Sequence, residues 1–479
     1  MNAADEILAT LDRLRAQDVP TRGGRTLSYV YDSGLAEADE VGRRVLAAYA
    51  GTNGLDPTAF PSLLALENDL VATAAQLAGA PDAVGTVTSG GTESILLAVL
   101  AARDDPRNTA AQRDSPSMVV PTTAHAAFHK AAHYFGVRPV FVDVDPQTYR
   151  ADPAAMARAV EPGTVLIVGS APSYAHGVVD PIPQLAAIGA ERGIRVHVDA
   201  CIGGWVLPFL KDAPDWNLAV PGVTSLSVDL HKYAYTPKGV SILLHREPRL
   251  RRCHYFAAAD WPGYTMLNTT MQSTKSGGPL AAAWAVVRFI GVDGYRALAQ
   301  TAVTATRTVA GELAARDLGL RVLATPDTTL LAVAANDADL DLFAVADEMT
   351  ARGWLLSPQL PFRGGPPSLH LSLCAATATR IDELLDALTD AVAAARTAGP
   401  AHLDPGLAQV LAALDPATLD EAAFGAVLAA AGRAAEGATL ALPERMAGIN
   451  SLLAQASPRL REALLLAFID RLARPKELP

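Results

Sequence analysis

The sequence predicts an α/β protein in which a large, mostly parallel sheet is accompanied by a smaller α/β domain. Short apolar runs of strand length alternate with helical patterns through the middle of the chain. That alternation is typical of a parallel sheet with helices on both faces. Half of the 479 residues are hydrophobic, so the chain can form a large core divided among two or three packed parts.

The expected strands of the large sheet follow one another with helices between them. The strands are Val84–Val87, Met118–Val120, Pro139–Val142, Val165–Gly169, Val196–Val198, Ser225–Val228 and Gly239–Leu244. The helices are Glu93–Arg103, Ala126–Phe135, Pro153–Val160 and Ile182–Arg192. Further on, one helix (Gly294–Arg316) and three strands (Leu320–Ala324, Thr329–Ala334, His370–Leu373) indicate the smaller domain.

These elements divide the chain into four expected parts. An N-terminal segment (1–60) precedes a large domain (61–294), which is followed by a small C-terminal α/β domain (295–400). The tail (401–479) is rich in Ala and Leu and has a helical pattern. Aspartate–proline and serine–proline pairs mark its helix starts: Asp404-Pro405, Asp415-Pro416 and Ser457-Pro458.

Charge and cysteine content exclude several classes of protein. The net charge of −11 argues against a nucleic-acid-binding protein, which would carry a basic face. Three cysteines without a CxxC pair (Cys201, Cys253 and Cys374) favour a reduced, cytoplasmic setting. Met1–Gln17 reads as an amphipathic stretch, not a signal sequence, and no apolar run approaches the roughly 20 residues of a membrane helix. We therefore expect a soluble protein without a transmembrane segment.

Three features needed by pyridoxal phosphate (PLP) occur in order along the chain. Gly90-Gly91-Thr92 precedes an apolar helix, where backbone N–H groups and a hydroxyl can bind a phosphate. Asp199 ends a strand and could keep the pyridine nitrogen protonated. Lys232 lies 33 residues later and offers an amine for a Schiff base with the cofactor. The set predicts a PLP site at the carboxyl ends of the strands.

Each of these residues also has an ordinary structural interpretation. The glycine turn could be a simple helix N-cap, and Asp199 could cap the next element. His125 could stack on the cofactor ring or merely begin a helix. Ser227 and His231 could reach the phosphate, or be a buried strand serine and a loop imidazole. Lys238 could carry a proton or contact a substrate anion, although a lysine in a Pro/Gly turn is most often solvated.

No metal site is expected. His197 lies on an alternating strand and reads as a hydrogen-bonded core residue. The chain contains no HExxH motif and no Cys/His spacing of the zinc-binding type.

Five stretches resemble the PLP-dependent group II decarboxylase family, and within it the sphingosine-1-phosphate lyases most. They are Val87–Leu96, His125–Ala132, Gly169–Pro172 with His176-Gly177, His197–Gly204 and His231–Gly239. The likeness extends from about residue 25 to about residue 295, with weaker similarity to the C-terminus.

The resemblance implies a PLP-dependent transferase fold of the aspartate-aminotransferase type (fold type I). It also implies a homodimer whose active sites are built from both subunits. By that likeness Lys232 forms the Schiff base, Asp199 contacts the pyridine nitrogen and His125 stacks on the ring. The phosphate would be surrounded by Gly91, Thr92, Ser227 and His231. Tyr31 and Lys238 correspond to positions near the substrate.

Two stretches depart from the lyase pattern. Where the lyases carry Asn-x-Leu-His-Pro, this chain has Asp56 in place of the histidine (Asn53–Pro57). A carboxylate facing the site would repel a phosphorylated substrate. Where the lyases carry Gly-Ser-Arg-Pro-Gly, which supplies a phosphate contact across the dimer, this chain has Ser273–Gly277. Thr274 keeps the hydroxyl, and Lys275 keeps the charge without the planar fork of arginine.

The resemblance leaves the reaction open between two main alternatives. In a PLP enzyme the protein selects the bond that breaks by orienting it perpendicular to the ring. A carbon–carbon lyase would cleave a β-hydroxy amine, phosphorylated or not, into an aldehyde and a small amine. An amino-acid decarboxylase would release carbon dioxide. A third interpretation, a PLP-binding scaffold without turnover, is disfavoured by the presence of Lys232, Asp199 and Lys238.

Overall fold

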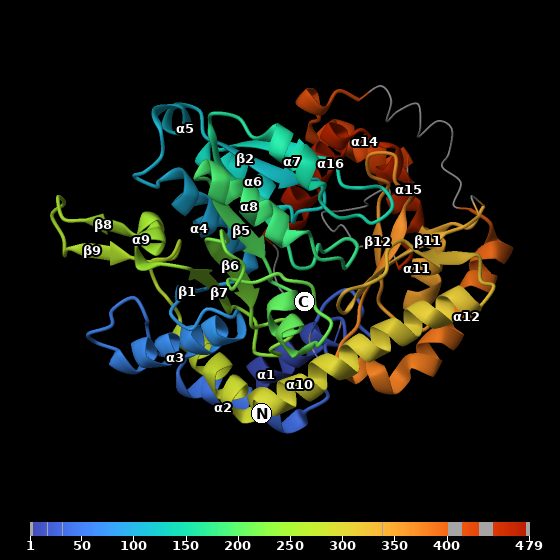
Figure 1. Ribbon diagram of the computed structural model, residues 1–479. Coiled ribbons are helices and arrows are strands. Elements are labelled where there is room, and N and C mark those ends of the chain that lie inside the picture. The colour runs from blue at the N-terminus through green and yellow to red at the C-terminus, as the bar shows by residue number, and fades with distance from the viewer. Residues whose placement is uncertain are drawn as a thin grey trace. The chain divides into compact units, whose positions relative to one another are not determined.

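The computed structural model describes residues 3–16, 18–30, 32–337, 339–400, 414–430 and 444–475. Its centre is a seven-stranded sheet with the order β1-β7-β6-β5-β4-β2-β3 (Figure 1). The strands are β1 (Val84–Thr88), β2 (Ser117–Pro121), β3 (Arg138–Val142), β4 (Thr164–Ser170), β5 (Arg195–Asp199), β6 (Ser225–Asp229) and β7 (Ser241–His245). Strands β2 to β6 are parallel to one another, and β7 runs antiparallel to both β6 and β1.

Helices cover both faces of this sheet because successive strand residues point to opposite sides. On β2, Met118 and Val120 face a cluster with α4 (Gly91–Arg103) and α6 (Ala127–Phe135). Val119, between them, faces a second cluster with α7 (Pro153–Ala159) and α8 (Ile182–Arg192). Such strands are buried on both faces, which explains their nearly continuous apolar sequences.

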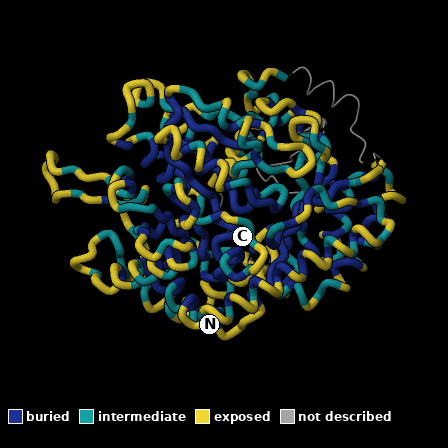
Figure 2. The backbone as a smooth tube through the Cα atoms, in the orientation of Figure 1, coloured by how far each residue is buried: buried dark blue, intermediate teal, exposed yellow. Residues whose placement is uncertain are grey.

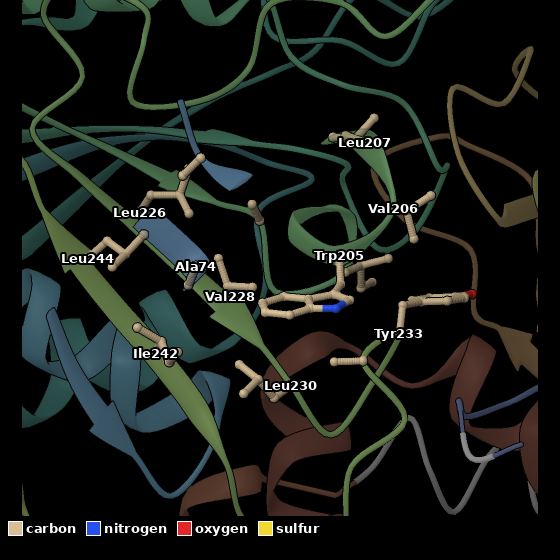
Figure 3. Packing of buried hydrophobic residues seen from close by; sticks show 14 of the residues in the cluster. Ala74, Trp205, Val206, Leu207, Leu226, Val228, Leu230, Tyr233, Ile242 and Leu244 are labelled. Carbon is tan, nitrogen blue, oxygen red and sulfur yellow. The ribbon is translucent and has the colours of Figure 1, made fainter. Parts of the chain in front are cut away.

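The largest apolar cluster lies around β6 and β7. It joins these strands to α3 (Pro61–Leu77) and to the short helices η1 (Gly203–Trp205) and η2 (Leu207–Phe209). Figure 3 shows Trp205 between the β6 side chains and Tyr233. Trp205 is 2 % exposed, and Tyr233 is fixed by a 2.9 Å hydrogen bond from its hydroxyl to the Leu373 carbonyl. This packing supports the chain that follows β6.

Further elements surround the sheet. Helices α1 (Ala3–Arg15) and α2 (Ala36–Ala48) come first, and α5 (Ala110–Asp114) precedes β2. After β7 come α9 (Pro248–Arg251), η3 (Arg252–His254) and an exposed hairpin of β8 (Phe256–Ala258) and β9 (Met266–Asn268) (Figure 2). Helix α10 (Gly277–Ala315) is interrupted at Gly291, whose φ of 68° is non-helical.

A second, four-stranded sheet has the order β10-β11-β13-β12. Its strands are β10 (Leu320–Val322), β11 (Leu330–Ala335), β12 (Ser357–Gln359) and β13 (Ser368–Ser372). It is accompanied by α11 (Leu342–Ala351), η4 (Ala375–Arg380) and α12 (Ile381–Ala398). In the tail the structure describes η5 (Pro416–Thr418), α14 (Glu421–Ala430), α15 (Ala447–Gln455) and α16 (Pro458–Leu472).

The chain forms two compact units. The first comprises Met1–Glu312, Val322–Ala332 and Leu371–Ile381 and contains the large sheet. The second comprises Leu313–Arg321, Val333–His370 and Asp382–Pro479. No described helix has both the length and the apolar composition of a membrane-spanning segment.

The α/β architecture predicted from the sequence is confirmed. Each of the seven predicted strands of the large sheet is present within two residues of its expected ends, and so are the four helices between them. The helix expected at Gly294–Arg316 begins earlier, at Gly277, because Gly-Gly-Pro opens α10 there instead of forming a loop. The helix starts at Asp415-Pro416 and Ser457-Pro458 are present, with Asp415 and Ser457 as N-caps. Asp404-Pro405 lies outside the described residues. The four-part division of the chain stays a prediction.

At the edge of the sheet where β5 and β6 begin, two histidines are stacked in the core. The rings of His245 and His254 have centroids 5.3 Å apart at an interplanar angle of 28°. Among the described residues, none of their four ring nitrogens has a hydrogen-bond partner. Burial, with nearby Arg251 and Arg195, lowers the pKa of His254 to about 3, and burial lowers that of His245 well below its usual value. Both rings are therefore neutral in the folded protein.

We predict that His254→Phe makes the protein less sensitive to mild acid. An unfolded histidine takes up a proton below pH 6.5, whereas the folded His254 does not, so the wild type loses stability as pH falls from 7 to 5. The phenyl ring keeps the volume and does not titrate. Between pH 7 and pH 5, the variant should lose about 1–2 kcal/mol less of its unfolding free energy than the wild type does. This would appear as a smaller difference between its Tm values at pH 7 and pH 5. If both proteins lost the same stability between pH 7 and pH 5, His254 would not be a source of the acid sensitivity.

Candidate active site

A cavity of about 390 Å³ opens at the carboxyl ends of β4, β5 and β6. These strands end at Ser170, Asp199 and Asp229, and the first turn of α4 closes one side. In parallel sheets, strand ends and helix N-termini converge on such a crevice. The lining residues are Ser89, Gly90, Gly91, Thr92, Glu93, Ile95, His125, Ser170, Pro172, Tyr174, Asp199, Cys201, Ile202, Asp229, His231 and Lys232.

Lys232 lies at the cavity wall on the turn that follows β6. Its amine is 2.9 Å from Asp229 Oδ2, and its side chain is 28 % exposed. Two tyrosines of this turn are tied to the chain near β13: Tyr233 donates to the Leu373 carbonyl, and the Tyr235 hydroxyl accepts the Ala375 N–H at 3.3 Å. The sequence therefore places the amine on a turn whose position is fixed by neighbouring buried side chains.

The environment keeps the Lys232 amine charged in this structure. Burial lowers its pKa, but the carboxylate of Asp229, with smaller contributions from Cys201 and Asp199, raises it above the ordinary value for lysine. For Asp229, burial raises the pKa, and the positive charge of Lys232 is the main influence that lowers it below its usual value. Burial together with the two carboxylates raises the pKa of the Cys201 thiol, so this cysteine stays protonated.

Asp199 lies one strand away from Asp229 and is 8 % exposed. Its Oδ1 accepts the Cys201 N–H at 3.1 Å and the Ser227 hydroxyl at 3.3 Å. These contacts hold the carboxylate at the cavity wall and leave Oδ2 for a further donor. Because Asp229 already pairs with the amine of Lys232, Asp199 is the carboxylate of the two that remains available to a further group in the cavity.

The glycine turn brings α4 against the end of β6. A Cβ on Gly91 would lie 2.8 Å from both Asp229 carboxylate oxygens and from Cys201 Sγ, so no larger residue fits without displacement. A Cβ on Gly90 would lie 3.5 Å from the His231 ring. Buried Glu93 accepts the Ser89 N–H at 2.6 Å and the Met271 N–H at 2.7 Å, which fixes the turn.

These residues fit PLP. The turn leaves its first N–H groups and the Thr92 hydroxyl at the cavity, where a helix N-terminus favours a phosphate. The Lys232 amine and the Asp199 carboxylate line the same cavity, and each matches a different end of the cofactor ring.

His125 and His231 both line the cavity. His125 Nδ1 accepts the N–H of Ala127, the first residue of α6, at 3.2 Å. Its ring centroid lies 6.5 Å from that of Tyr174, which also lines the cavity. His231 Nδ1 accepts the Val240 N–H at 3.3 Å, which leaves Nε2 3.6 Å from Asp229 Oδ2. Burial lowers the pKa of His231, so its imidazole is neutral.

Ser227 does not line the cavity. Its hydroxyl lies 3.3 Å from His197 Nε2 and from Asp199 Oδ1. His197 also pairs with the Ser225 hydroxyl at 2.9 Å, so it is the hydrogen-bonded core residue that the sequence indicated. Ser227 thus donates a hydrogen bond to Asp199 from the side away from the cavity. A contact between Ser227 and the phosphate stays a prediction.

Lys238 lies beside the turn that carries Lys232. Its amine donates to the carbonyls of Val30 at 2.8 Å and His231 at 2.7 Å. Burial of the amine and the positive charge of Lys232 lower its pKa to about 8, although the residue as a whole is exposed in the single chain. Tyr31, predicted to lie near the substrate, is outside the described residues.

The two stretches that depart from the lyase pattern lie side by side. Asn53 pairs with Ser276 in an antiparallel bridge, and its Oδ1 accepts the Lys275 N–H at 3.0 Å. Lys275 Nζ lies 2.6 Å from both carboxylate oxygens of Glu67, so its charge is already compensated.

Two residues of these stretches, Asp56 and Thr274, are exposed and are not among the residues that line the cavity. Asp56 accepts hydrogen bonds from the Thr58 and Ala59 N–H groups and from the Thr58 hydroxyl, which lower its pKa. In the single chain its carboxylate therefore organises a local turn.

Several polar residues that line the cavity were not predicted from the sequence, among them Asp229, Glu93 and Tyr174. Asp229 could have been found from its spacing, because a carboxylate at the end of a strand and three residues before the lysine can reach the amine. Glu93 could have been found as an acid in the first turn after a phosphate-binding glycine pair. Tyr174 is brought to the cavity by the loop after β4, and its spacing from the other residues carries no signal.

Comparison with known proteins identifies relatives over most of the chain. The family model described as the pyridoxal-dependent decarboxylase conserved domain matches residues 35–333. A second model, for a C-terminal HTH domain of pyridoxal-dependent enzymes, matches residues 405–471. The sphingosine-1-phosphate lyase of Dictyostelium discoideum is 38% identical over 68% of this chain, and sphingosine-1-phosphate lyase 1 of Rattus norvegicus is 36% identical over 77%. The chain spans only 60% and 64% of the lengths of these two relatives.

Two solved structures are informative. A sphingosine-1-phosphate lyase from Burkholderia pseudomallei has 33% identity and a TM-score of 0.76, covering 83% of this chain and 92% of that one. A glutamate decarboxylase from Lactobacillus brevis has a TM-score of 0.74 with 20% identity, which supports the fold alone. The predicted resemblance, the fold class and the cofactor are confirmed by these matches.

We predict that Lys232 is the residue to which PLP becomes attached. Borohydride reduction of the cofactor-loaded protein, followed by peptide mapping, should place the reduced adduct on the peptide that contains Lys232. Lys232→Ala should yield no adduct and should lose its cofactor on gel filtration, whereas a matched variant of an exposed lysine, Lys211→Ala, should behave as the wild type. An adduct on another lysine in the wild type would overturn the assignment.

Proposed function

We infer the function from family membership: the chain belongs to the pyridoxal-dependent decarboxylase family, and we propose that it is a PLP-dependent carbon–carbon lyase. The proposed substrate is a β-hydroxy amine, phosphorylated as in the sphingosine-1-phosphate lyases, and the products are an aldehyde and a small amine. The proposal is supported most by one observation, the 33% identity to the Burkholderia lyase across 92% of that chain.

The cofactor, once bound, supplies an electron sink that stabilises the carbanion left by bond cleavage. In this proposal the Lys232 amine holds the cofactor, and the Asp199 carboxylate keeps a proton on the ring nitrogen. The first turn of α4 binds the phosphate, and His125 limits the space above the ring.

Lys238 is the proposed base. Cleavage of a β-hydroxy amine requires removal of the hydroxyl proton, and an amine with a pKa of about 8 can accept it near neutral pH. Its amine donates to the carbonyl of His231, the residue before Lys232, so Lys238 lies beside the turn that carries the Lys232 amine. Tyr31, which follows Val30, remains a second proposed contact of the substrate.

The decarboxylase alternative uses the same cofactor residues and has less support. The decarboxylase structures that match have low identity, such as the 20% of the Lactobacillus enzyme. A scaffold without turnover is disfavoured because the amine, the two carboxylates and the phosphate turn share one cavity.

We further propose a homodimer with shared active sites, in the cytoplasm. Large apolar side chains are exposed on the hairpin of β8 and β9: Phe256 at 58 %, Tyr264 at 67 % and Leu267 at 59 %. An isolated hairpin is only marginally stable in water, so a second copy covering it would explain this composition. The cytoplasmic location is supported by three cysteines that are all free.

We predict that Lys238→Ala lowers kcat by about 10²- to 10⁴-fold while the cofactor remains attached to Lys232. In the wild type, kcat/KM should rise through pH 8 as the base loses its proton, and this dependence should be absent from the variant. Product analysis of a panel of phosphorylated and unphosphorylated β-hydroxy amines and amino acids provides the measurement. Release of carbon dioxide without any aldehyde would contradict the lyase proposal and support the decarboxylase alternative. Full activity of the variant would show that Lys238 is not the base.

We predict that two inactive variants restore activity when mixed. Lys232→Ala removes the amine from one subunit's site, and Thr274→Glu places a negative charge at the proposed phosphate contact across the dimer. Randomly exchanged dimers should recover about a quarter of wild-type activity, because each mixed dimer keeps one intact site. Sedimentation should give twice the chain mass. A monomer with full activity, or no recovery after proven subunit exchange, would contradict the shared site.

A further inference from the structure

The carboxylate of Asp229 lies in contact with both the Lys232 amine and the first turn of α4. Asp229 is 2 % exposed, and its Oδ2 is 2.9 Å from Lys232 Nζ. Both of its oxygens would also lie 2.8 Å from a Cβ on Gly91, so the first turn of α4 packs closely against the carboxylate. The carboxylate is therefore in close contact with both the amine and the glycine turn.

The amine is the principal partner of this carboxylate. Asp229 Oδ1 has no hydrogen-bond donor among the described residues. The Ser241 hydroxyl, which lies nearby, donates instead to the Val228 carbonyl at 3.0 Å. A buried carboxylate with an oxygen that lacks a donor is costly unless a cation compensates its charge, so Asp229 and Lys232 depend on each other.

Other titratable groups face this pair from each element that surrounds it. Asp199 and Cys201 lie on and after β5, His231 and Lys238 on the turn after β6, and Glu93 and His125 at the start of α4 and α6. The Cys201 thiol is protonated and the His231 imidazole neutral, whereas the positive charge of Lys238 opposes a charge on Lys232. Glu93 is engaged by two backbone N–H groups. Asp229 is thus the anion in direct contact with the amine.

We propose that Asp229 is a positioning residue that keeps a positive charge on the Lys232 nitrogen and fixes its direction toward the cavity. In the cofactor-free protein the charge is that of the ammonium group. For the nitrogen to act as a nucleophile, one N–H bond breaks and the proton passes to Asp229 Oδ2, forming an O–H bond. The proton would return from Asp229 Oδ2 to the Lys232 nitrogen once that nitrogen is bonded to the cofactor's carbonyl carbon, with release of one water. Asp229 would then again be a carboxylate facing a charged nitrogen, and no other reactant is needed.

A consequence for the glycine turn follows from this geometry. Gly91 was expected to let the backbone approach a phosphate. The structure gives it a further purpose, because only hydrogen at this position leaves space for the Asp229 carboxylate against the amine. Adding a methyl group at residue 91 should therefore disturb the charge of Lys232, in addition to phosphate binding.

This inference deepens the proposed function, since it concerns the amine that holds PLP. Its test uses the cofactor-free protein and does not measure activity. Failure of the test would leave the lyase proposal intact, and failure of the lyase proposal would leave the ion pair intact.

The test is competitive acylation of the cofactor-free protein with acetic anhydride over a range of pH, with mass spectrometry of the Lys232 peptide. The exposed Lys211 serves as the internal reference. In the wild type, the labelling midpoint of Lys232 should lie above that of Lys211. Asp229→Asn should lower the Lys232 midpoint by at least about one pH unit, roughly a tenfold gain in labelling at a fixed pH below it.

Asp199→Asn is the matched control, because it removes a carboxylate from the same cavity that does not touch the amine. It should shift the midpoint less than Asp229→Asn does. If Asp229→Asn fails to fold, as judged by circular dichroism, Gly91→Ala provides the second variant and should also lower the midpoint. An unchanged midpoint in a folded Asp229→Asn or Gly91→Ala protein, or an equal shift in Asp199→Asn, would overturn the proposal.

Discussion

The close approach of α4 to the carboxyl end of β6 is the contact on which the site depends. It exists because Gly91 has no side chain and because Asp229 is the last residue of a strand that is buried on both faces. The contact places a helix N-terminus, a carboxylate and an amine around one cavity. Each of these groups would be unfavourable alone in a buried position, and together they compensate one another.

The parts of the fold that the sequence predicts are those governed by periodicity. Strands buried on both faces have continuous apolar runs, and the helices between them have clear starts, so their positions are readable. The antiparallel direction of β7 is not readable, because its apolar run fits either orientation. The start of α10 at Gly277 was also missed, since Gly-Gly-Pro favours a loop unless the following helix is packed against a core.

In the candidate site, too, some residues could be predicted from the sequence and others could not. Lys232, Asp199 and the glycine turn could be predicted because each occupies a junction between elements, where chain order implies position. The role of Glu93 depends on the hydrogen bond that it accepts from the Met271 N–H, 178 residues away. The role of Ser227 depends on whether its hydroxyl faces the cavity or His197. The pairing of Lys275 with Glu67 likewise joins distant segments. Such contacts follow from tertiary packing, and no local pattern specifies them.

The two lysines near the cavity illustrate how one turn can produce two different amines. Lys232 touches a buried carboxylate, and its pKa is raised. Lys238 donates to two backbone carbonyls, and burial together with the charge of Lys232 lowers its pKa to about 8. Pairs of titratable groups whose pKa values are driven apart by their surroundings commonly divide acid and base roles between them. Here the charged amine is suited to hold the cofactor, and the amine with the lower pKa is suited to exchange a proton with a substrate. Asp229 accounts for much of this difference, because its carboxylate is in contact with the Lys232 amine and there offsets the lowering of the pKa by burial.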